Sequence, residues 1–417
     1  IELIDLKERY KEESNQILKS IDKVLSKGHL VLTEELSEFE NSVCKYTGSK
    51  YCLGLNSGTD ALMMALWSLN IKKDDEVITS PLSFIASVGA IAHVGAKPVF
   101  VDVKDDQNID VNSVNLQFDC CYEDILRVKN IILNNNHDAV IATGGGKVLD
   151  SGKYIADSLN IPCITVPLSA STCAGWTALS NIYTKNGQFI KDVALRSCPK
   201  VLVYDHKFIQ TAPSRTLASG IADALAKWYE SSITSSTIED GLVQQAIQIS
   251  RVLRDQLLID GEKAFKGKFE NNPSWRNTIE ACGLTAGLVG GIGGEKCRTA
   301  AAHAIHNAIT QIITPNKFLH GEIVGVGILL QLRLEEMKNN NKLADQSIKQ
   351  LLVLMKELNL PTTIGQLGIN VFENNNLEKI ADFTCRDKSE IHFLPFEISK
   401  QDIIEVISNF EQQKIKI

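Results

Sequence analysis

Long apolar runs and concentrated positive charge are both missing from this chain of 417 residues. The longest apolar stretch, from Ile323 to Leu330, is far shorter than the roughly 20 residues that a helix needs to cross a bilayer. The 43 Lys and Arg residues are scattered among 50 Asp and Glu residues, so the net charge is -7 and there is no basic stripe. Because nucleic-acid binding needs such a stripe, we expect neither nucleic acid nor a membrane as a partner.

Paired cysteines of the metal-binding or disulfide-framework type are missing as well. None of the ten cysteines has a CxxC spacing, and in a chain of this length such residues are typical of buried or free thiols in a reducing compartment. The first residues, from Ile1 to Asp5, do not have the charge layout of a secretory signal peptide. We therefore expect a cytoplasmic protein.

Histidine is scarce, but its distribution is uneven. Three of the eight histidines, His303, His306 and His320, fall within eighteen residues. His303 and His306 lie three apart in an alanine-rich run, so they share a helix face, and His320 follows the break at Pro315 and Asn316. This spacing indicates the beginning of a divalent metal site, which usually supplies catalysis. A buried histidine with a purely structural role is the alternative for His303 or His306.

Asp223 is the best candidate for the carboxylate that a metal site needs. It lies among Ile, Ala and Leu residues, where an unpaired charge is costly to bury. Coordination to a cation would offset this cost, and a buried pair with Lys227, one turn further on, is the alternative. One carboxylate and two imidazoles leave an open position for a substrate oxygen, as a catalytic ion requires.

Three consecutive glycines, Gly144, Gly145 and Gly146, separate an expected strand from an expected helix. Their bare N–H groups and the positive end of the helix dipole suit a pyrophosphate, and a tight turn without a ligand is the alternative. The loop is neither GxGxxG nor a Walker loop. The next strand ends in hydroxyl side chains, from Ser169 to Thr177, at the edge where cofactors bind in parallel sheets. A capped loop is the alternative there.

Strands and helices alternate in the first half of the chain, which predicts a parallel sheet. The expected strands are 51–55, 76–79, 97–102, 139–142 and 162–166. The expected helices are 5–26, 60–69, 85–94, 122–134 and one from 147 onward. Beyond Pro213 the pattern is helical almost to the end. The predicted fold class is α/β, with an N-terminal parallel-sheet, Rossmann-like nucleotide-binding half followed by an all-helical metal-binding domain. The predicted domains are 1–112, 113–213 and 214–417.

Residues from about 117 to 417 resemble the iron-containing alcohol dehydrogenase superfamily, on its glycerol dehydrogenase side. Five motifs match in chain order, at 144–150, 171–180, 223–230, 302–307 and 320–322. Glycerol dehydrogenases carry Asp at the position of Cys173. The Cys173 version is similar to the hydroxycarboxylate dehydrogenase branch.

This resemblance implies roles for the motif residues. Asp223, His303 and His320 would hold one divalent metal, for which zinc fits best and iron, nickel or manganese are alternatives. His306 would be no ligand: it would be the catalytic group that relays the proton, with water as the alternative carrier, or a group that supports the ligands from beside them. The cofactor would be NAD or NADP, the substrate a small molecule and the assembly a homo-oligomer. The cofactor-binding residues, from the pyrophosphate toward the nicotinamide end, would be Gly144, Gly145, Gly146, Lys147, Asp150, Ser171, Thr177, Leu179 and Tyr183.

Residues 1–112 resemble a different family, the start of the DegT-type sugar aminotransferases, which use pyridoxal phosphate. The matching motifs are 4–7, 39–40, 56–62, 75–78, 83–87 and 95–102. In that family Gly58 and Thr59 cradle the cofactor phosphate, and Phe84 stacks on its ring. The resemblance ends before the Schiff-base Lys, and without that Lys the internal aldimine cannot form.

The predicted function is a metal-dependent, NAD(P)-linked oxidoreductase that interconverts a small alcohol or 2-hydroxy acid and its ketone or 2-oxo acid. An aminotransferase-like protein that lacks the Schiff-base Lys, and an inactive fusion that binds metal only, are the alternatives. The first strands of the dehydrogenase nucleotide domain have no counterpart here. Two outcomes are therefore open: the first 116 residues complete that domain, or they impair cofactor binding.

Overall fold

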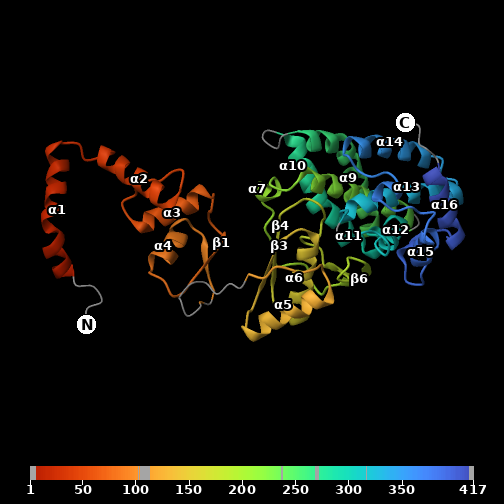
Figure 1. Cartoon of the computed structure of the whole chain (residues 1–417), viewed down its shortest axis with the longest axis horizontal. Coiled ribbons are helices and arrows are strands. Elements are labelled where there is room, and N and C mark those ends of the chain that lie inside the picture. The colour runs from red at the N-terminus through yellow and green to blue at the C-terminus, as the bar shows by residue number, and fades with distance from the viewer. Residues whose placement is uncertain are drawn as a thin grey trace. The chain divides into compact units, whose positions relative to one another are not determined.

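The computed structural model describes residues 6–101, 103, 113–235, 238–267, 272–315 and 317–412. Two compact units make up the chain, Ile1–Ser113 and Val114–Ile417. We describe each unit by itself (Figure 1). The predicted domain boundary after residue 112, parts of the motifs at 4–7 and 95–102, and Asn316 lie outside the described residues.

Helices and one pair of strands make up the first unit. Its elements are α1 (Leu6–Ser26), α2 (Glu34–Thr47), α3 (Gly58–Ser68), β1 (Glu76–Thr79), α4 (Ala86–His93) and β2 (Lys97–Phe100). The two strands are parallel, with Glu76 opposite Lys97. The strand expected at 51–55 does not form. The N–H of Gly54 donates to Oε1 of Glu40 at 2.7 Å, so this segment bonds a side chain of α2 in place of a strand.

The apolar core of the first unit is small. Ile91, Val94 and Ala96 form its buried cluster, and Ala90 is buried as well. α2 and α3 have no buried side chain at all. Large apolar side chains are accordingly exposed on this unit, among them Trp67 and Phe84.

Parallel strands and a hairpin open the second unit. Its first elements are α5 (Tyr122–Asn134), β3 (Val140–Gly144), α6 (Gly146–Leu159), β4 (Cys163–Pro167), β5 (Leu179–Tyr183), β6 (Phe189–Ala194) and β7 (Val201–Leu202). The parallel order is β3-β4-β7, and β5 pairs with β6 antiparallel. The carboxyl ends of β3 and β4 lie side by side, with Gly144 opposite Pro167. The sequence pattern does not predict the hairpin, because an inward position of β5 is the polar Ser180, which donates to the carbonyl of Asp150.

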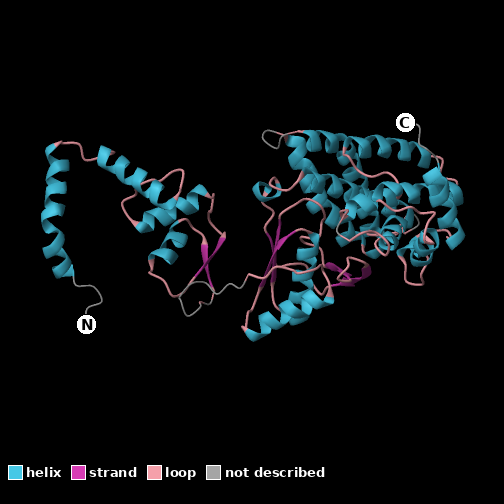
Figure 2. Ribbon diagram, viewed as in Figure 1, coloured by secondary structure: helices cyan, strands magenta, loops and turns pink. Residues whose placement is uncertain are grey.

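Helices form the rest of the second unit. They are α7 (His206–Ile209), α8 (Ser214–Thr234), α9 (Gly241–Lys266), α10 (Pro273–Glu280), η1 (Ala281–Thr285), α11 (Ala286–Gly293), η2 (Glu295–Cys297), α12 (Ala301–Ile309), α13 (His320–Asn339), α14 (Ala344–Glu357), η3 (Gly365–Leu367), α15 (Asn376–Thr384), η4 (Glu390–Phe393) and α16 (Lys400–Gln412). Among the described residues beyond Pro213 there is no strand, which confirms the predicted α/β fold with a helical C-terminal part (Figure 2). The division of this unit at residue 213 stays a prediction.

No helix in the described part of the chain combines the length and the apolar character that crossing a bilayer requires.

α8, α12 and α13 lie at the centre of the helical part, and all nine residues of α12 are buried. Two glycines allow other segments to approach α8 closely. A Cβ on Gly321 would lie 1.8 Å from the carbonyl oxygen of Ser219, and a Cβ on Gly220 would lie 1.9 Å from that of Ala170. α8 therefore touches both the first turn of α13 and the loop after β4.

Candidate active site

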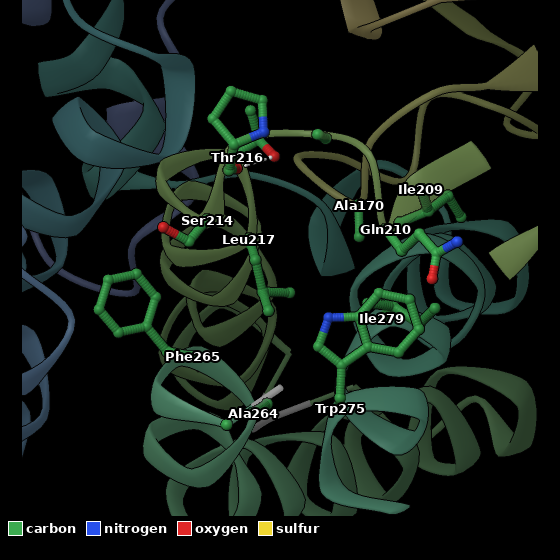
Figure 3. A pocket seen from close by; sticks show the side chains of 13 residues that line it. Ala170, Ile209, Gln210, Ser214, Thr216, Leu217, Ala264, Phe265, Trp275 and Ile279 are labelled. Atoms are coloured by element: carbon green, nitrogen blue, oxygen red, sulfur yellow. Dashed lines mark hydrogen bonds between the residues drawn. The ribbon is translucent and has the colours of Figure 1, made fainter. Parts of the chain in front are cut away.

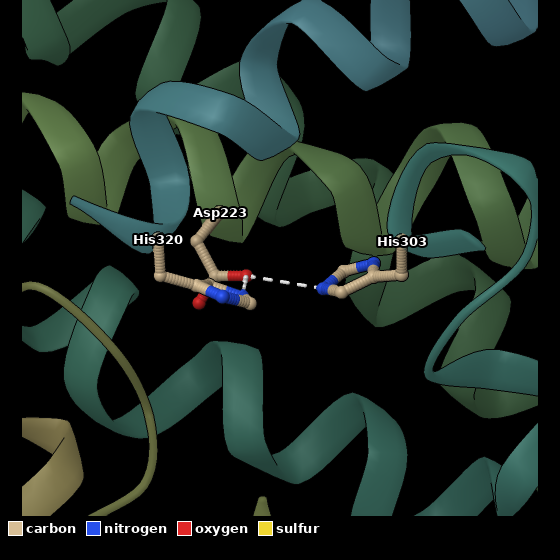
Figure 4. A group of neighbouring side chains, drawn as sticks. All are labelled: Asp223, His303 and His320. Carbon is tan, nitrogen blue, oxygen red and sulfur yellow. Dashed lines mark ion pairs between the residues drawn. The ribbon is translucent and has the colours of Figure 1, made fainter. Parts of the chain in front are cut away.

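Three helices bring the predicted ligand residues together. Asp223 is on α8, His303 is on α12, and His320 is the first residue of α13. The Nε2 atoms of His303 and His320 lie 3.5 Å and 3.6 Å from the same oxygen, Oδ1 of Asp223 (Figure 4). One ligand atom from each residue lies within 4.8 Å of the others. The side chains thus converge on one point, as a metal site requires.

The state of Asp223 fits a divalent ion. Its side chain is buried, and Oδ1 has no hydrogen-bond partner among the described residues. Leaving a charged oxygen unpaired in the interior is costly. Burial opposes ionisation, but Lys227 and the two histidines hold the pKa of this carboxyl well below its usual range. A carboxylate with two imidazoles is a donor set that zinc and related ions bind.

The alternative partner of Asp223 is engaged elsewhere. The ammonium group of Lys227 donates to the carbonyl oxygen of Arg298 at 3.3 Å. It forms no ion pair with Asp223 in the described structure. Lys227 therefore contributes a nearby charge, but it does not occupy the point on which the three ligand atoms converge.

Glu230 is a residue of the candidate site that the sequence pattern did not single out. It is fully buried on α8, two turns after Asp223. Its Oε2 lies 2.6 Å from Nδ1 of His303, and its Oε1 accepts from the backbone N–H groups of Ala300 and His303. Burial opposes a charge on His303, but Glu230 and Asp223 raise the pKa of that imidazole to about 9. The sequence does contain a signal for Glu230: it is a second carboxylate on the same apolar helix, seven residues after Asp223.

His320 is held by contacts around the start of α13. Glu322 accepts the N–H of Leu319 through Oε2 at 2.7 Å, which closes the first turn of the helix. The guanidinium of Arg215, on α8, donates to both carboxylate oxygens of Glu322. The N–H of Gly321 donates to the hydroxyl of Ser219 at 3.0 Å. These bonds tie the first turn of α13 to α8, and with it the ring of His320.

His306 lies beside the three ligand candidates. Its ring centroid is 4.2 Å from that of His320 and 6.4 Å from that of His303. Nδ1 of His306 lies 2.9 Å from Oδ1 of Asn307. Burial and the two neighbouring histidines hold the pKa of His306 well below its usual range, so its imidazole is neutral.

The glycine loop lies at the carboxyl ends of two neighbouring parallel strands. Gly144 ends β3, and α6 begins at Gly146. A Cβ on Gly145 would meet no atom within 4 Å, so its backbone faces open space. A Cβ on Gly146 would lie 2.8 Å from Cγ2 of Thr172, so the glycine loop and the hydroxyl-rich loop after β4 are in contact.

Lys147 and Asp150, two predicted cofactor-binding residues, have side chains that bond other protein groups. The ammonium group of Lys147 pairs with the carboxylate of Asp119. Asp150 is buried, 2.9 Å from Nζ of Lys153, and accepts the N–H of Asn181. The carboxylate of Asp150 therefore joins α6 to β5.

The other predicted cofactor-binding residues surround the same two loops. Lys153 donates to the carbonyl oxygens of Thr177 and Leu179, which ties this segment to α6. The ring of Tyr183 lies 5.9 Å from Nζ of Lys147. The hydroxyl of Ser171 is 3.0 Å from that of Ser169.

The loop after β4 also reaches the metal-site helix. Ala170 contacts Gly220, three residues before Asp223. Cys173 packs against the helical core. Burial raises the pKa of this thiol, Lys227 opposes the rise, and Asp223 adds to it. The glycine loop, the hydroxyl-rich loop and the metal-site helix thus form a continuous set of contacts.

A cavity of about 410 Å³ lies elsewhere, near the first turn of α8. Trp275, Phe265 and Leu217 are among the apolar side chains around it (Figure 3). None of the three ligand candidates lines this cavity, so we treat it as separate from the candidate active site.

Comparison with known proteins identifies two families. Residues 11–120 match the DegT/DnrJ/EryC1/StrS aminotransferase family, and residues 85–206 match iron-containing alcohol dehydrogenases. The two matches overlap at 85–120, a range that includes the domain boundary predicted after residue 112.

The relatives and the solved structures that match the larger part of the chain are oxidoreductases. An uncharacterized oxidoreductase of Synechocystis is 42% identical over 286 residues, which are 69% of this chain and 74% of that protein. Glycerol dehydrogenase of Thermotoga maritima is 32% identical over 292 residues, 68% of this chain and 77% of that protein. The crystal structure of a probable glycerol dehydrogenase from Sinorhizobium meliloti has a TM-score of 0.63 at 26% identity, covering 85% of this chain and 95% of that one. The chain therefore belongs to the iron-containing alcohol dehydrogenase family, and it carries at its N-terminus a segment of the DegT/DnrJ/EryC1/StrS aminotransferase family.

Proposed function

We propose that this protein is a metal-dependent, NAD(P)-linked oxidoreductase that interconverts a small alcohol or 2-hydroxy acid and its ketone or 2-oxo acid. Membership of an alcohol dehydrogenase family supports the reaction class. One observation best supports this chemistry: the imidazoles of His303 and His320 face a buried carboxylate oxygen of Asp223 that has no hydrogen-bond partner among the described residues. Cys173, where glycerol dehydrogenases carry Asp, favours a substrate other than glycerol.

Asp223, His303 and His320 are the proposed metal ligands. These residues would hold a divalent ion, which would supply polarisation of the substrate oxygen and a lower pKa of the alcohol. Zinc is our first choice. Iron, nickel and manganese are alternatives, because one carboxylate and two imidazoles suit all four metals.

The proposed cofactor site lies at the two adjacent loops. Gly144, Gly145 and Gly146 would hold the pyrophosphate at the start of α6, where backbone N–H groups and the helix dipole favour an anion. Ser171, Thr177, Leu179 and Tyr183 would line the nicotinamide end, and the cofactor would supply the hydride chemistry. The contact of Ala170 with Gly220 supports this order, because it brings the hydroxyl-rich loop next to the metal-site helix. Lys147 pairs with Asp119 and Asp150 pairs with Lys153, and these ion pairs stabilise the segment that follows the glycine loop.

His306 is the proposed proton carrier. Since Oδ1 of Asn307 only accepts, Nδ1 of His306 donates to it, and Nε2 is left with a lone pair. A neutral, buried imidazole of this kind accepts the alcohol proton at Nε2 and returns it in the reverse reaction.

The test uses the full chain loaded in turn with zinc, iron, nickel and manganese. We expect oxidation of NADH or NADPH that depends on a hydroxyketone or 2-oxo acid, disappears with a chelator and returns when metal is restored. Absence of this activity with all four metals and both cofactors would contradict the proposal.

A metal-binding protein without dehydrogenase activity is the second candidate. It is favoured by the pairing of Lys147 with Asp119 and by the N-terminal segment of another family. Tight metal binding without any NAD(P)H fluorescence change would support it. An absorbance band that borohydride removes would instead support pyridoxal phosphate bound as an aldimine. The cytoplasmic location and the homo-oligomeric state expected from the sequence stay predictions, which cell fractionation and light scattering would test.

A further inference from the structure

We infer that Glu230 is the positioning residue of the metal centre: one buried carboxylate fixes the tautomer of His303 and anchors the first turn of its helix. This inference rests on the proposed metal site and adds a residue that is not one of its ligands. Glu230 contacts no other ligand candidate in the described structure, so it acts through His303.

Both oxygens of Glu230 are fully used. Oε2 lies 2.6 Å from Nδ1 of His303, and Oε1 accepts the N–H of Ala300 at 2.6 Å and that of His303 at 3.0 Å. A carboxylate is an acceptor only, so Nδ1 of His303 must carry the hydrogen. The lone pair of the neutral ring is then on Nε2, the atom that faces Asp223 at 3.5 Å. A carboxylate behind the imidazole thus orients the ring and increases its basicity as a ligand.

The same carboxylate replaces a missing cap. α12 begins at Ala301, and its N-cap residue, Ala300, has no side chain that accepts a hydrogen bond. The first N–H groups of a helix need acceptors, and a negative charge at that end is favourable. Glu230 supplies the acceptor for two of these N–H groups and also the negative charge. A third N–H, that of Ala302, donates to Oε1 of Gln331 at 3.0 Å. The backbone of His303 and its ring are therefore fixed by one group.

Glu230→Gln separates orientation from simple packing, because the side chain keeps its size. If the amide oxygen of Gln keeps the two backbone N–H groups, its NH₂ faces Nδ1 of His303 and forces the hydrogen onto Nε2, where it blocks a metal. If the amide turns over, its NH₂ meets two N–H donors and the cap is lost. Both arrangements disfavour metal binding.

Zinc affinity of the full chain, measured by competition with a chromophoric chelator, tests the inference. We expect Glu230→Gln to bind zinc on the order of 10–100-fold more weakly than the wild type. Glu411→Gln is the matched control: Glu411 is a half-buried glutamate on α16 whose two oxygens accept the N–H groups of Ile364 and Gly365, and it touches no ligand candidate. It should bind zinc as the wild type does.

Unchanged zinc affinity in Glu230→Gln overturns the inference, and so does an equal loss in both variants. If Glu230→Gln does not fold, ¹⁵N-histidine NMR of the zinc-loaded wild type decides. Zinc on Nε2 of His303 with a proton on Nδ1 supports the inference, and the reverse arrangement overturns it. A wild type that binds none of the four metals would instead contradict the proposed function, and the inference with it.

Discussion

Asp223, His303 and His320 come from three different helices, yet two imidazole nitrogens face one carboxylate oxygen. At the residue scale this shared oxygen explains the electrostatics of the site. The carboxyl is ionised although it is buried, because Lys227, His303 and His320 lower its pKa. His306, one turn from His303, stays neutral in the same surroundings. The pKa of His303 is raised and that of His306 is lowered because their partners differ.

Replacing His306 with Gln should separate proton transfer from metal binding. The side chain lies beside the proposed ligand set and is not a member of it, so the metal content should be unchanged. We expect kcat to fall by roughly 100-fold or more, the loss typical of a missing general acid–base group. Steady-state kinetics and the zinc content per chain measure the two effects.

His29→Gln, an exposed position in the first unit, is the control for that variant. A His306→Gln protein with the kcat of the wild type would show that water, or another group, carries the proton.

At the element scale, the start of α13 determines where His320 lies. This turn is tied to α8 through Glu322, Arg215 and Ser219, and the helices meet where Gly321 has no side chain. Helix identity was predictable from the sequence here, because apolar periodicity is local. The tight contact was not predictable, because Ser219 and Gly321 are far apart in the chain.

Gly321→Ala should push α13 away from α8. The new Cβ would lie 1.8 Å from the carbonyl oxygen of Ser219, which is backbone and cannot rotate away. We expect the free energy of unfolding to fall by about 1–3 kcal/mol, as for other overpacked positions, and zinc to bind more weakly because His320 moves. Urea unfolding and chelator competition measure both.

Gly291→Ala on α11 is the matched control, because its Cβ would meet no atom within 4 Å. It should be neutral or stabilise the helix by up to about 1 kcal/mol. If both variants had the same stability and zinc affinity, the close contact at Gly321 would be ruled out as the cause of any loss.

α16 is attached to α13 by a group whose effect depends on pH. Burial opposes ionisation of Asp402, but hydrogen bonds with Ser399 and Lys338 lower its pKa from the ordinary 3.8. A lowered pKa means that the carboxylate stabilises the fold above about pH 3.8 and that this stabilisation is lost as the pH falls through the folded-state value. We expect Asp402→Asn to lower the free energy of unfolding by about 1 kcal/mol at pH 7.

The difference between Asp402→Asn and the wild type should vanish in strong acid, which urea unfolding at several pH values measures. Asp382→Asn, an exposed carboxylate on α15 that pairs with Lys400, should change stability little at any pH. A difference that persists unchanged in acid would contradict an ionic origin.

At the scale of the whole molecule, the two units differ in how much apolar surface they bury. The second has a large core built around α8, α12 and α13, and the first has a cluster of three buried side chains. The aminotransferase match covers most of the first unit, and the alcohol dehydrogenase match lies mostly in the second.

Amide hydrogen exchange should show this difference directly. We expect the backbone amides of α2 and α3 to exchange much faster than those of α8 and α12, because few buried contacts oppose local opening. Equal protection in both sets would mean that the apolar faces of the first unit are covered in solution, for instance by another copy of the chain.

Local patterns in the sequence determined most of the helices, the parallel strands β1 to β4, and the candidate ligand set of Asp223, His303 and His320. Helical spacing and the cost of a buried charge can both be read along the chain. Tertiary structure alone decided three further features: the carboxylate of Glu230 behind His303, the pairing of Lys147 with Asp119, and the absence of a strand at 51–55. Each depends on which groups the fold brings within hydrogen-bonding distance. Residues 73, 28 and 14 positions apart meet in these contacts, and no local pattern encodes such meetings.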